Sequence, residues 1–170
     1  MLFRSVAGEI EIRAPTNFVG YLDNPEATRE AVDAEGWFRT GDLGRLRGDG
    51  SFVFLTRRGD ALRLGGFLVD PTEIEAALAR QPGVAQAQVV GVEIDGRSRC
   101  VAFVVPSPGV RPDERALAAA IAATMAGYKV PARIWLVDEF PVTRSANATK
   151  IQRAKLREMA LERLKEAGAS

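Results

Sequence analysis

The chain has 170 residues, of which 46% are hydrophobic and 26% are charged. At this length roughly 70% of the surface of the unfolded chain can be buried, so one modest domain, or one small domain with part of another, is expected. The 23 basic and 22 acidic residues leave a net charge of +1. Such a balance excludes the strong positive field with which proteins gather nucleic acid or an anionic membrane surface.

Several kinds of chemistry are excluded by residue types that are absent or occur once. There is no histidine, and the only cysteine, Cys100, lies in an apolar run. A histidine general base, an intrachain disulfide and a cysteine metal cluster are therefore excluded, and Cys100 is predicted to be core packing. No stretch reaches the length of a signal peptide or a membrane span, which predicts a soluble, cytoplasmic protein.

The first part of the chain predicts strands and one short helix. Residues 8–12 alternate polar and apolar side chains, as in a half-buried strand. Asn24 followed by Pro25 is typical of a helix start, and this helix is expected to end near Gly36. Between residues 43 and 55, two apolar runs flank a turn that holds two glycines and an aspartate. This pattern predicts an antiparallel hairpin.

After residue 60 the pattern predicts a separate α+β layer structure. A second hairpin is expected over residues 62–69, turning at Gly65 and Gly66. The remaining elements follow in the order helix, strand, strand, helix, strand, helix, at residues 70–81, 84–92, 99–105, 113–126, 133–137 and the charged C-terminal stretch. We place the domain boundary after residue 56, so that residues 1–56 form a β-rich domain and residues 57–170 form the α+β domain.

A loop and a helix start near the C-terminus hold a local contradiction. A long polar loop is predicted from Pro141, and Thr149 and Gln152 have the spacing of a capping box at the start of the last helix. Lys150 then falls at the first helical position, where its charge faces the positive end of the helix dipole at a cost of roughly 0.3 to 1 kcal/mol. Such violations tend to mark functional sites, although a lysine that swings into solvent explains the pattern as well.

Two further features have the chemistry to bind a nucleotide or a slender ligand. Asp42 lies between a glycine-containing turn and the expected start of a strand, where a carboxylate can accept hydrogen bonds from both hydroxyls of a ribose. Arg57 has the charge to bind a phosphate, and Gly65 and Gly66 would let a narrow ligand run close to the backbone. A turn-capping aspartate, a solvated charge and a tight hairpin turn are the plainer explanations. The sequence has no metal-ligand constellation and no GxxxxGK[ST] loop.

Five blocks of the sequence, taken together, resemble a known family. They are GYLDNPEAT (20 to 28), GWFRTGDLG (36 to 44), TRRGDALRLGGFLVDPTEIEAAL (56 to 78), YKVP (128 to 131) and PVTRSANATKIQR (141 to 153). In order and spacing the chain is similar to the later part of the AMP-forming acyl-CoA synthetases, members of the adenylate-forming superfamily. The resemblance implies that residues 57–170 form the small lid domain of that family. It also implies that residues 1–56 form the last, β-rich subdomain of the family's large body.

The resemblance implies an activity in two half-reactions. In this family a carboxylate attacks the α-phosphate of ATP to give an acyl-adenylate and pyrophosphate. After a large rotation of the C-terminal domain, a thiol, usually that of CoA, displaces AMP. A fatty or aryl carboxylic acid is the substrate class that the overall resemblance suggests.

Each candidate residue takes a role from the resemblance. Asp42 matches the aspartate that binds the ribose hydroxyls, and Arg57 matches the arginine that contacts the nucleotide just before the hinge. Lys150 matches the catalytic lysine that bridges the carboxylate and the α-phosphate, where a desolvated ammonium stabilises the negative charge of the transition state. Gly59 falls at the hinge. The segment Gly65–Gly66 matches the part that lines the tunnel for the pantetheine arm of CoA.

The sequence also departs from the family pattern. Gly59 stands where the family usually has aspartate or lysine, and Ala148 and Thr149 replace a glycine that often precedes the catalytic lysine. The phosphate loop, the adenine-binding aromatic and the magnesium-binding glutamate of the family lie upstream, and nothing similar occurs before Gly8. ATP and Mg²⁺ would therefore be held mainly by an N-terminal body that is missing from this chain. By itself the chain is expected to be inactive.

Three hypotheses follow from these observations. The chain is a fragment of an acyl-CoA ligase, or a non-catalytic partner that docks onto a separately encoded body, or an adenylation unit that acts on a carrier-protein thiol. CoA is preferred to a carrier protein because no carrier domain follows and the KIQRAKLR stretch continues the family pattern. Residues 1–56 would expose strand faces that normally pack on the body, which predicts pairing with a second copy.

Overall fold

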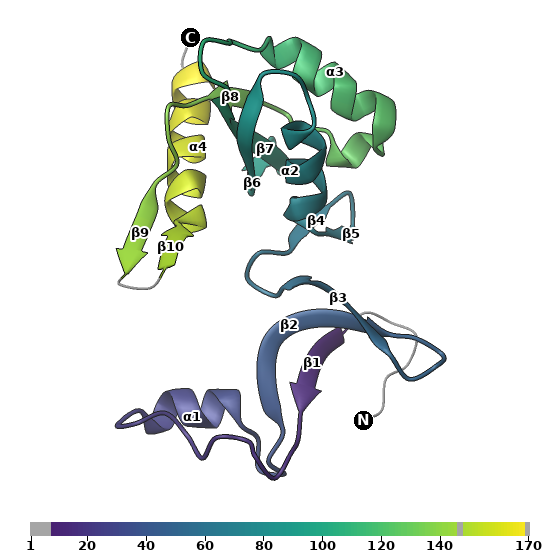
Figure 1. Cartoon of the computed structure of the whole chain (residues 1–170), viewed down its shortest axis with the longest axis vertical. Helices are drawn as coiled ribbons and strands as arrows, with labels where there is room; N and C mark the ends of the chain where they lie inside the picture. The colour runs from purple at the N-terminus through teal and green to yellow at the C-terminus, as the bar shows by residue number, and fades with distance from the viewer. Residues whose placement is uncertain (1–7, 146–147, 169–170) are drawn as a thin grey trace. The chain divides into compact units, whose positions relative to one another are not determined.

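The computed structural model describes residues 8–145 and 148–168, and the chain divides into two compact units, Met1–Ala61 and Leu62–Ser170. Figure 1 shows the elements of both. We call them unit 1 and unit 2, and each is described by itself. The units divide after Ala61, whereas the sequence placed the domain boundary after residue 56.

Unit 1 is a three-stranded antiparallel sheet with one short helix. Its elements are β1 (Gly8–Ile12), α1 (Pro25–Ala31), β2 (Phe38–Leu46) and β3 (Phe52–Arg57). The central strand is β2, which pairs with both β1 and β3. The side chain of Asn24 accepts a hydrogen bond from the amide of Ala27 at 3.0 Å, as expected of a helix cap.

Helix α1 ends earlier than the sequence predicted, because a competing turn follows it. Its last residue is Ala31, not a residue near Gly36. The carboxylate of Asp33 accepts hydrogen bonds from the amides of Glu35 and Trp37, at 3.0 and 2.8 Å. Such a local side-chain acceptor offers the backbone an alternative to helical hydrogen bonds. The chain therefore turns here and enters β2.

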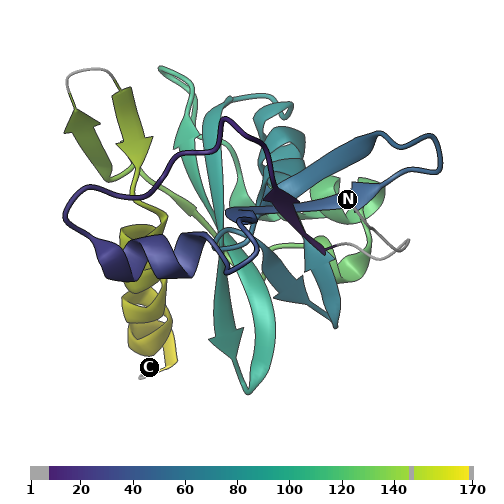
Figure 2. The same ribbon diagram turned by 90° about the horizontal axis from the view of Figure 1, so that it is seen from below.

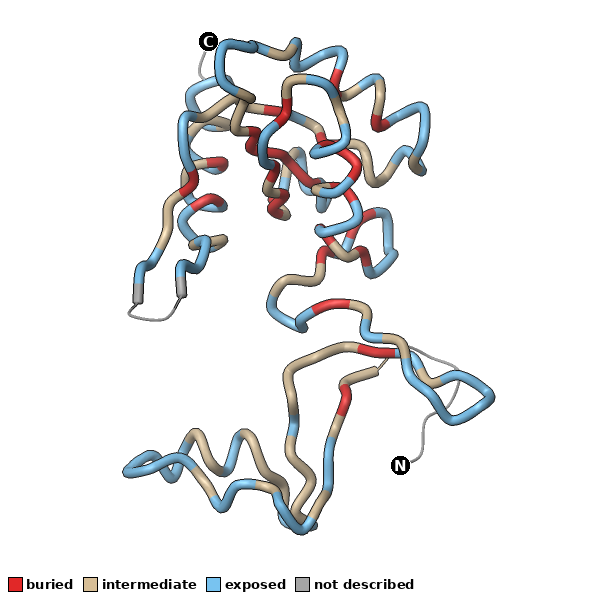
Figure 3. The backbone as a smooth tube through the Cα atoms, viewed as in Figure 1, coloured by how far each residue is buried: buried red, intermediate tan, exposed pale blue. Residues whose placement is uncertain are grey.

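Unit 1 buries few side chains, as the scarcity of red along β1 to β3 in Figure 3 shows. Of its described residues, only Ile10, Gly44 and Thr56 are buried. Large apolar side chains are exposed instead, at Ile12, Phe18, Val19, Tyr21, Leu22, Phe52 and Phe54. A sheet needs a second layer to bury an apolar face, and within unit 1 only the short α1 accompanies the sheet.

Unit 2 is a mixed α+β structure, in agreement with the fold class predicted from the sequence. Its elements are β4 (Leu62–Leu64), β5 (Phe67–Val69), α2 (Pro71–Ala79), β6 (Val84–Ile94), β7 (Arg97–Pro106), α3 (Glu114–Thr124), the 3₁₀ turn η1 (Gly127–Lys129), β8 (Ile134–Leu136), β9 (Val142–Ser145), β10 (Ala148–Ile151) and α4 (Arg153–Gly168). The main sheet has the order β6-β7-β8, antiparallel between β6 and β7 and parallel between β7 and β8. In the part of the chain that the structure describes, no helix is long and apolar enough to cross a membrane.

The main sheet of unit 2 is covered on both faces. Successive strand residues point to opposite faces, so alternate side chains of β6 and β7 enter different hydrophobic clusters. Cys100 and Ala102 belong to the cluster formed with β4, β5, α2 and α3, whereas Val101 and Phe103 belong to the cluster formed with α4. Figure 1 shows α2 and α3 on one side of this sheet and α4 on the other. Unit 2 therefore has its own three-layer core.

The segment between β8 and α4 differs from the long polar loop that the sequence predicted. It contains the antiparallel hairpin β9–β10, in which Lys150 pairs with Thr143. Helix α4 begins at Arg153, so the predicted capping box and the placement of Lys150 at the first helical position are wrong. Lys150 is a strand residue, and the helix dipole provides no reason to single it out.

The hairpin forms because its residues favour strands and because Gln152 closes it. β-branched side chains, which suit strands, occupy much of both arms, at Val142, Thr143, Thr149 and Ile151. The amide of Gln152 donates to the carbonyl oxygen of Pro141 at 2.8 Å. The Gln152 side chain, expected as part of the capping box, instead donates to the hydroxyl of Thr143 at 2.7 Å.

Candidate functional site

Asp42 and Arg57, the predicted nucleotide-binding residues, lie opposite each other on β2 and β3. Arg57 Nε donates a hydrogen bond to Asp42 Oδ1 at 2.9 Å. The Arg57 side chain is 66% exposed and that of Asp42 is 28% exposed. A surface ion pair of this kind adds at most about 1 kcal/mol to stability. The bond uses one guanidinium N–H and one carboxylate oxygen, so both side chains retain groups that can contact a ribose or a phosphate.

A bulge in β2 sets the position of the Asp42 side chain. The register between β1 and β2 shifts here, and Gly41 has a φ of +72°, which glycine adopts without strain. Thr40 holds the bulge, since its hydroxyl donates to the carbonyl oxygen of Ile10 at 2.7 Å and accepts from the amide of Asp42 at 3.0 Å. Bulges re-aim side chains next to sites. Asp42 thus lies within β2, not at the strand start that the sequence predicted.

Gly59, the predicted hinge, lies in the turn after β3. The carbonyl oxygen of Arg57 accepts hydrogen bonds from the amides of Asp60 and Ala61, at 3.0 and 2.9 Å. A β-carbon added to Gly59 would meet no described atom within 4 Å, and the backbone of Gly59 is not left-handed. The fold of this turn does not require glycine, and the hinge role stays a prediction.

Lys150 lies on β10 with an exposed side chain. Among residues 8–145 and 148–168, none forms a hydrogen bond or an ion pair with its ammonium group. Figures 1 and 2 both show the β9–β10 hairpin projecting beyond the N-terminal end of α4. An ammonium in this position can contact a second molecule directly. Lys150 belongs to unit 2, whereas Asp42 and Arg57 are brought together within unit 1.

Gly65 and Gly66 form the turn between β4 and β5, beside a groove of about 580 Å³ within unit 2. Their φ angles are +57° and +85°, as a two-residue type I′ hairpin turn requires. A β-carbon on Gly65 would lie 3.2 Å from that of Tyr128, whose ring stacks on Phe67 with centroids 4.8 Å apart. Glycine therefore keeps the turn close to an aromatic wall.

Three arginines line the same groove, namely Arg63, Arg97 and Arg99. All three are exposed, and Arg97 and Arg99 are two residues apart on β7, so they project from the same face of the strand. Guanidinium groups bind phosphates in bidentate fashion, and an aromatic ring can stack on a planar base. The sequence prediction missed these arginines. The Arg97-Ser98-Arg99 alternation directly after a turn was the signal that could have revealed them.

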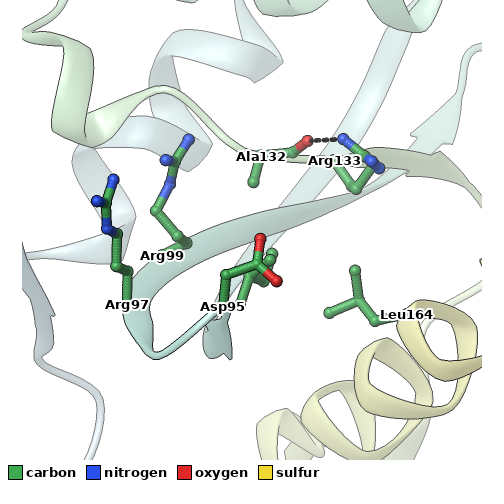
Figure 4. Close-up of a pocket in the computed structure, with 7 residues that line it drawn as sticks. Asp95, Arg97, Arg99, Ala132, Arg133 and Leu164 are labelled. Carbon is green, nitrogen blue, oxygen red and sulfur yellow. Dashed lines mark hydrogen bonds between the residues drawn. The ribbon is translucent and has the colours of Figure 1, made fainter. Parts of the chain in front are cut away.

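Arg97 and Arg99 also border a second hollow of about 530 Å³, which Figure 4 shows. Its other lining residues are Ile94, Asp95, Ala132, Arg133 and Leu164. Arg133 Nη1 donates to the carbonyl oxygen of Ala132 at 2.9 Å. Asp95 is the one carboxylate among the lining residues. Arg97 and Arg99 thus border both hollows, at the end of the β6–β7 hairpin.

Cys100 is fully buried in the core of unit 2, as the sequence predicted. Its Sγ lies 3.7 Å from the carbonyl oxygen of Lys129. Burial raises the pKa of the Cys100 thiol from 9.0 to about 11, an effect only partly offset by the nearby charge of Arg99. A buried thiol that stays protonated is a poor nucleophile, so Cys100 has a packing role.

The described residues do not fit a magnesium site. Residues 8–145 and 148–168 contain no group of three or more histidine, cysteine, aspartate or glutamate side chains that could hold a metal ion. Magnesium prefers carboxylate oxygens supplemented by phosphate and water. No chemical step is assigned to a metal held by this part of the chain.

Comparison with known proteins shows which proteins the chain is similar to. Residues 73–147 match the family model of the AMP-binding enzyme C-terminal domain. The 2-succinylbenzoate–CoA ligase of Geobacillus kaustophilus is 45% identical over 154 residues, which cover 90% of this chain and 31% of that ligase. The 4-coumarate–CoA ligase 1 of Oryza sativa subsp. japonica is 37% identical over 158 residues, which cover 92% of this chain and 28% of that ligase.

The solved structures point to the same class. The ATP-bound structure of MatB from Rhodopseudomonas palustris has a TM-score of 0.78 and 34% identity, and the match covers 93% of this chain and 31% of MatB. The chain is thus similar to the C-terminal portion of adenylate-forming enzymes, which confirms the resemblance found in the sequence. The chain spans about 30% of the length of the curated relatives named above.

Proposed function

We propose that this chain serves as the C-terminal region of an AMP-forming acid–thiol ligase. The reaction activates a carboxylic acid with ATP to an acyl-adenylate and pyrophosphate, and then transfers the acyl group to the thiol of CoA with release of AMP. The observation that carries the proposal is the groove at Gly65 and Gly66, which is lined by three arginines and by Tyr128, whose ring stacks on Phe67. This combination matches the chemistry of CoA.

CoA carries phosphates, a purine base and a narrow pantetheine arm, and the groove offers a partner for each. Arg63, Arg97 and Arg99 supply guanidinium groups for the phosphates, and Tyr128 supplies a face or edge for the base. The glycine turn leaves space for the arm beside the backbone. The arginines favour free CoA, with its additional phosphate, over a carrier-protein thiol.

The first half-reaction is assigned to Asp42, Arg57 and Lys150. Asp42 would accept hydrogen bonds from the ribose hydroxyls, while Arg57, aligned by its bond to Asp42, would contact the nucleotide. The exposed Lys150 ammonium would lie between the carboxylate and the α-phosphate. Negative charge grows on those oxygens in the transition state, and a positioned cation in a water-excluded site stabilises it. Gly59 would serve as the pivot about which the C-terminal domain rotates between the first and the second half-reaction.

Lys150→Ala tests this assignment. In the ligase that contains this chain, pyrophosphate release from carboxylate and ATP should slow by ~10²- to 10³-fold, as is typical when one preorganised electrostatic donor is removed. Thioester formation from supplied acyl-adenylate and CoA should change far less, since Lys150 then has no developing charge to stabilise. The matched control is Lys155→Ala, which removes another exposed lysine five positions along the chain.

Two outcomes would contradict the role of Lys150. An equal fall of both half-reactions would show that Lys150 supports the fold of the hairpin. No fall in either reaction, or the same fall in Lys155→Ala, would remove Lys150 from the chemistry.

We further propose that ATP and Mg²⁺ are held mainly by an N-terminal body onto which unit 1 packs, in a cytoplasmic enzyme. The exposed apolar side chains of unit 1 and the lack of a metal site among the described residues support this proposal. Pairing with a second copy through residues 1–56 is the competing use of the same surface. Light scattering distinguishes them, because a monomer over a wide concentration range would exclude the paired form.

A further inference from the structure

Backbone groups on the free edge of β6 form hydrogen bonds with side chains instead of with another strand. Because β6 lies at the edge of the sheet, alternate backbone groups face away from β7. The amide of Val89 donates to Glu75 Oε1 at 2.9 Å, and the carbonyl oxygen of Val89 accepts from Arg153 Nη1 at 3.1 Å. Arg157 Nε donates to the carbonyl oxygen of Gly91 at 2.9 Å. An exposed edge strand can pair with a strand of another chain, and these side-chain contacts occupy backbone groups of β6 that such pairing would use.

Glu75 of α2 and Arg153 of α4 link these two helices. Arg153 Nη1 donates to Glu75 Oε1 at 2.8 Å, and Nη2 donates to Oε2 at 3.2 Å. This is a bidentate pair, which fixes orientation as well as distance. The side chains are only 11% exposed for Glu75 and 26% exposed for Arg153. The four bonds among Glu75, Arg153 and the backbone of Val89 therefore form one partly buried network.

The position of Arg153 in the chain ties this network to Lys150. Arg153 is the first residue of α4, and only Ile151 and Gln152 separate it from Lys150. Gln152 closes the β9–β10 hairpin through its bonds to Pro141 and Thr143. A rotation of the first turn of α4 would thus be transmitted directly to the strand that carries Lys150.

We propose that Glu75 and Arg153 are positioning residues: the bidentate pair fixes the first turn of α4 on the edge of β6 and thereby aims the β9–β10 hairpin and Lys150. The effect of this positioning on catalysis rests on the proposed function. The structural half of the inference, that the pair holds the hairpin in place, rests on the contacts alone. Neither Glu75 nor Arg153 is assigned a contact with substrate. A preorganised cation requires such support, since a side chain on an unsupported hairpin is not held within the tolerance that catalysis needs.

Amide hydrogen exchange on the complete chain tests the structural half without any activity. Glu75→Gln removes the charge but keeps a carbonyl oxygen for the Val89 amide, and Arg153→Lys keeps the charge but loses the bidentate geometry. Both should speed exchange at Gln152 and across β9 and β10 by about 10-fold, the effect of losing a hydrogen bond to a charged group. Exchange in β7 should stay as in the wild type.

Arg157→Lys is the matched control. It alters an arginine that also binds a β6 carbonyl, but one turn further from Lys150 and without Glu75 as partner. Hairpin exchange should therefore remain close to the wild-type rate. Unchanged hairpin exchange in Glu75→Gln and Arg153→Lys, an equal rise in Arg157→Lys, or an equal rise throughout β7 would each overturn the positioning role.

Half-reaction kinetics test the chemical consequence. In the ligase that contains this chain, Glu75→Gln should lower kcat for pyrophosphate release by about 10-fold or more with little change in KM for ATP, because the ATP-binding groups remain while the cation is misplaced. Thioester formation from supplied acyl-adenylate should be spared. An equal loss in both reactions would overturn the inference. A wild-type enzyme without pyrophosphate release would instead contradict the proposed function, and the exchange result would still decide the structural half.

Discussion

Unit 1 and unit 2 have comparable kinds of apolar residues but use them in opposite ways. In unit 2, Phe103 and Leu156 are 0% exposed and lie in a core built on both faces of a sheet. In unit 1, Phe54 is 54% exposed and Leu22 is 92% exposed. The difference lies in the layers. Helices cover both faces of the β6-β7-β8 sheet, whereas among the described residues of unit 1 no comparable layer covers β1-β2-β3. Unit 2 therefore buries its own core, whereas the described part of unit 1 leaves large apolar side chains exposed.

The two units also contribute different candidate residues. Unit 1 supplies a surface ion pair, in which Asp42 lies beside the bulge of the central strand β2 and Arg57 lies on the neighbouring strand β3. Unit 2 supplies a rigid core from which the Gly65–Gly66 turn and the Lys150 hairpin project. A domain with its own core does not depend on constant contacts with another domain.

The largest expected effect compares one phenylalanine from each unit. Phe103→Ala should destabilise unit 2 by about 3 to 5 kcal/mol, because it removes a fully buried ring and leaves a cavity. Phe54→Ala should change stability by about 0.5 kcal/mol or less and should increase solubility, since its ring is exposed. Urea unfolding followed by the fluorescence of Trp135 in unit 2 measures the first, and that of Trp37 in unit 1 measures the second. A large loss of stability in Phe54→Ala would contradict the contrast between the two units, because it would show that unit 1 buries this ring in solution.

The second effect uses the buried thiol of unit 2. Because burial raises the pKa of Cys100 to about 11, its contribution to stability is complete below its ordinary value of 9.0 and is lost as the pH rises towards 11. The loss should amount to roughly 2 to 3 kcal/mol across this window. The measurement is the difference in unfolding free energy between wild type and Cys100→Ala on both sides of the window, which cancels the titration of other groups. A difference that does not change with pH would show that the thiol is accessible to water.

The smallest effect compares two glycines. Gly66→Ala should cost about 1 kcal/mol, because the φ of +85° is strained for any other residue. Gly59→Ala should be neutral or slightly stabilising, by about 0.4 to 1 kcal/mol, since the added methyl meets open space and the unfolded chain loses freedom. Thermal unfolding of both variants gives the comparison. If Gly59→Ala is stabilising yet slows the exchange between half-reactions, the hinge assignment gains support; unaltered exchange would weigh against it.

The sequence predicted the elements whose signals are local. Asn24 and Asp70 mark helix starts, and the glycine pairs mark hairpin turns, because caps and turns depend on residues close together in the chain. The apolar runs at residues 84–92 and 99–105 likewise predicted strands, and the structure confirms them as β6 and β7. The prediction for the segment around Lys150 was wrong because a capping-box spacing and a strand rich in β-branched residues compete there. The pairing with β9 and the closure by Gln152 decide in favour of the strand.

From the sequence by itself, the order of the elements predicted the α+β class, and the motifs with their spacing indicated the resemblance to the family. The motifs also marked the candidate residues Asp42, Arg57, Gly65, Gly66 and Lys150. Contacts between residues far apart in the chain were decided only by the tertiary structure. Arg57 reaches Asp42 across two strands, Arg63 shares a groove with Arg97 and Arg99, and Arg153 meets Glu75 at the edge of β6. The physical reason is that capping and turn chemistry act over a few residues, whereas these contacts depend on register and layer packing, which no local pattern encodes.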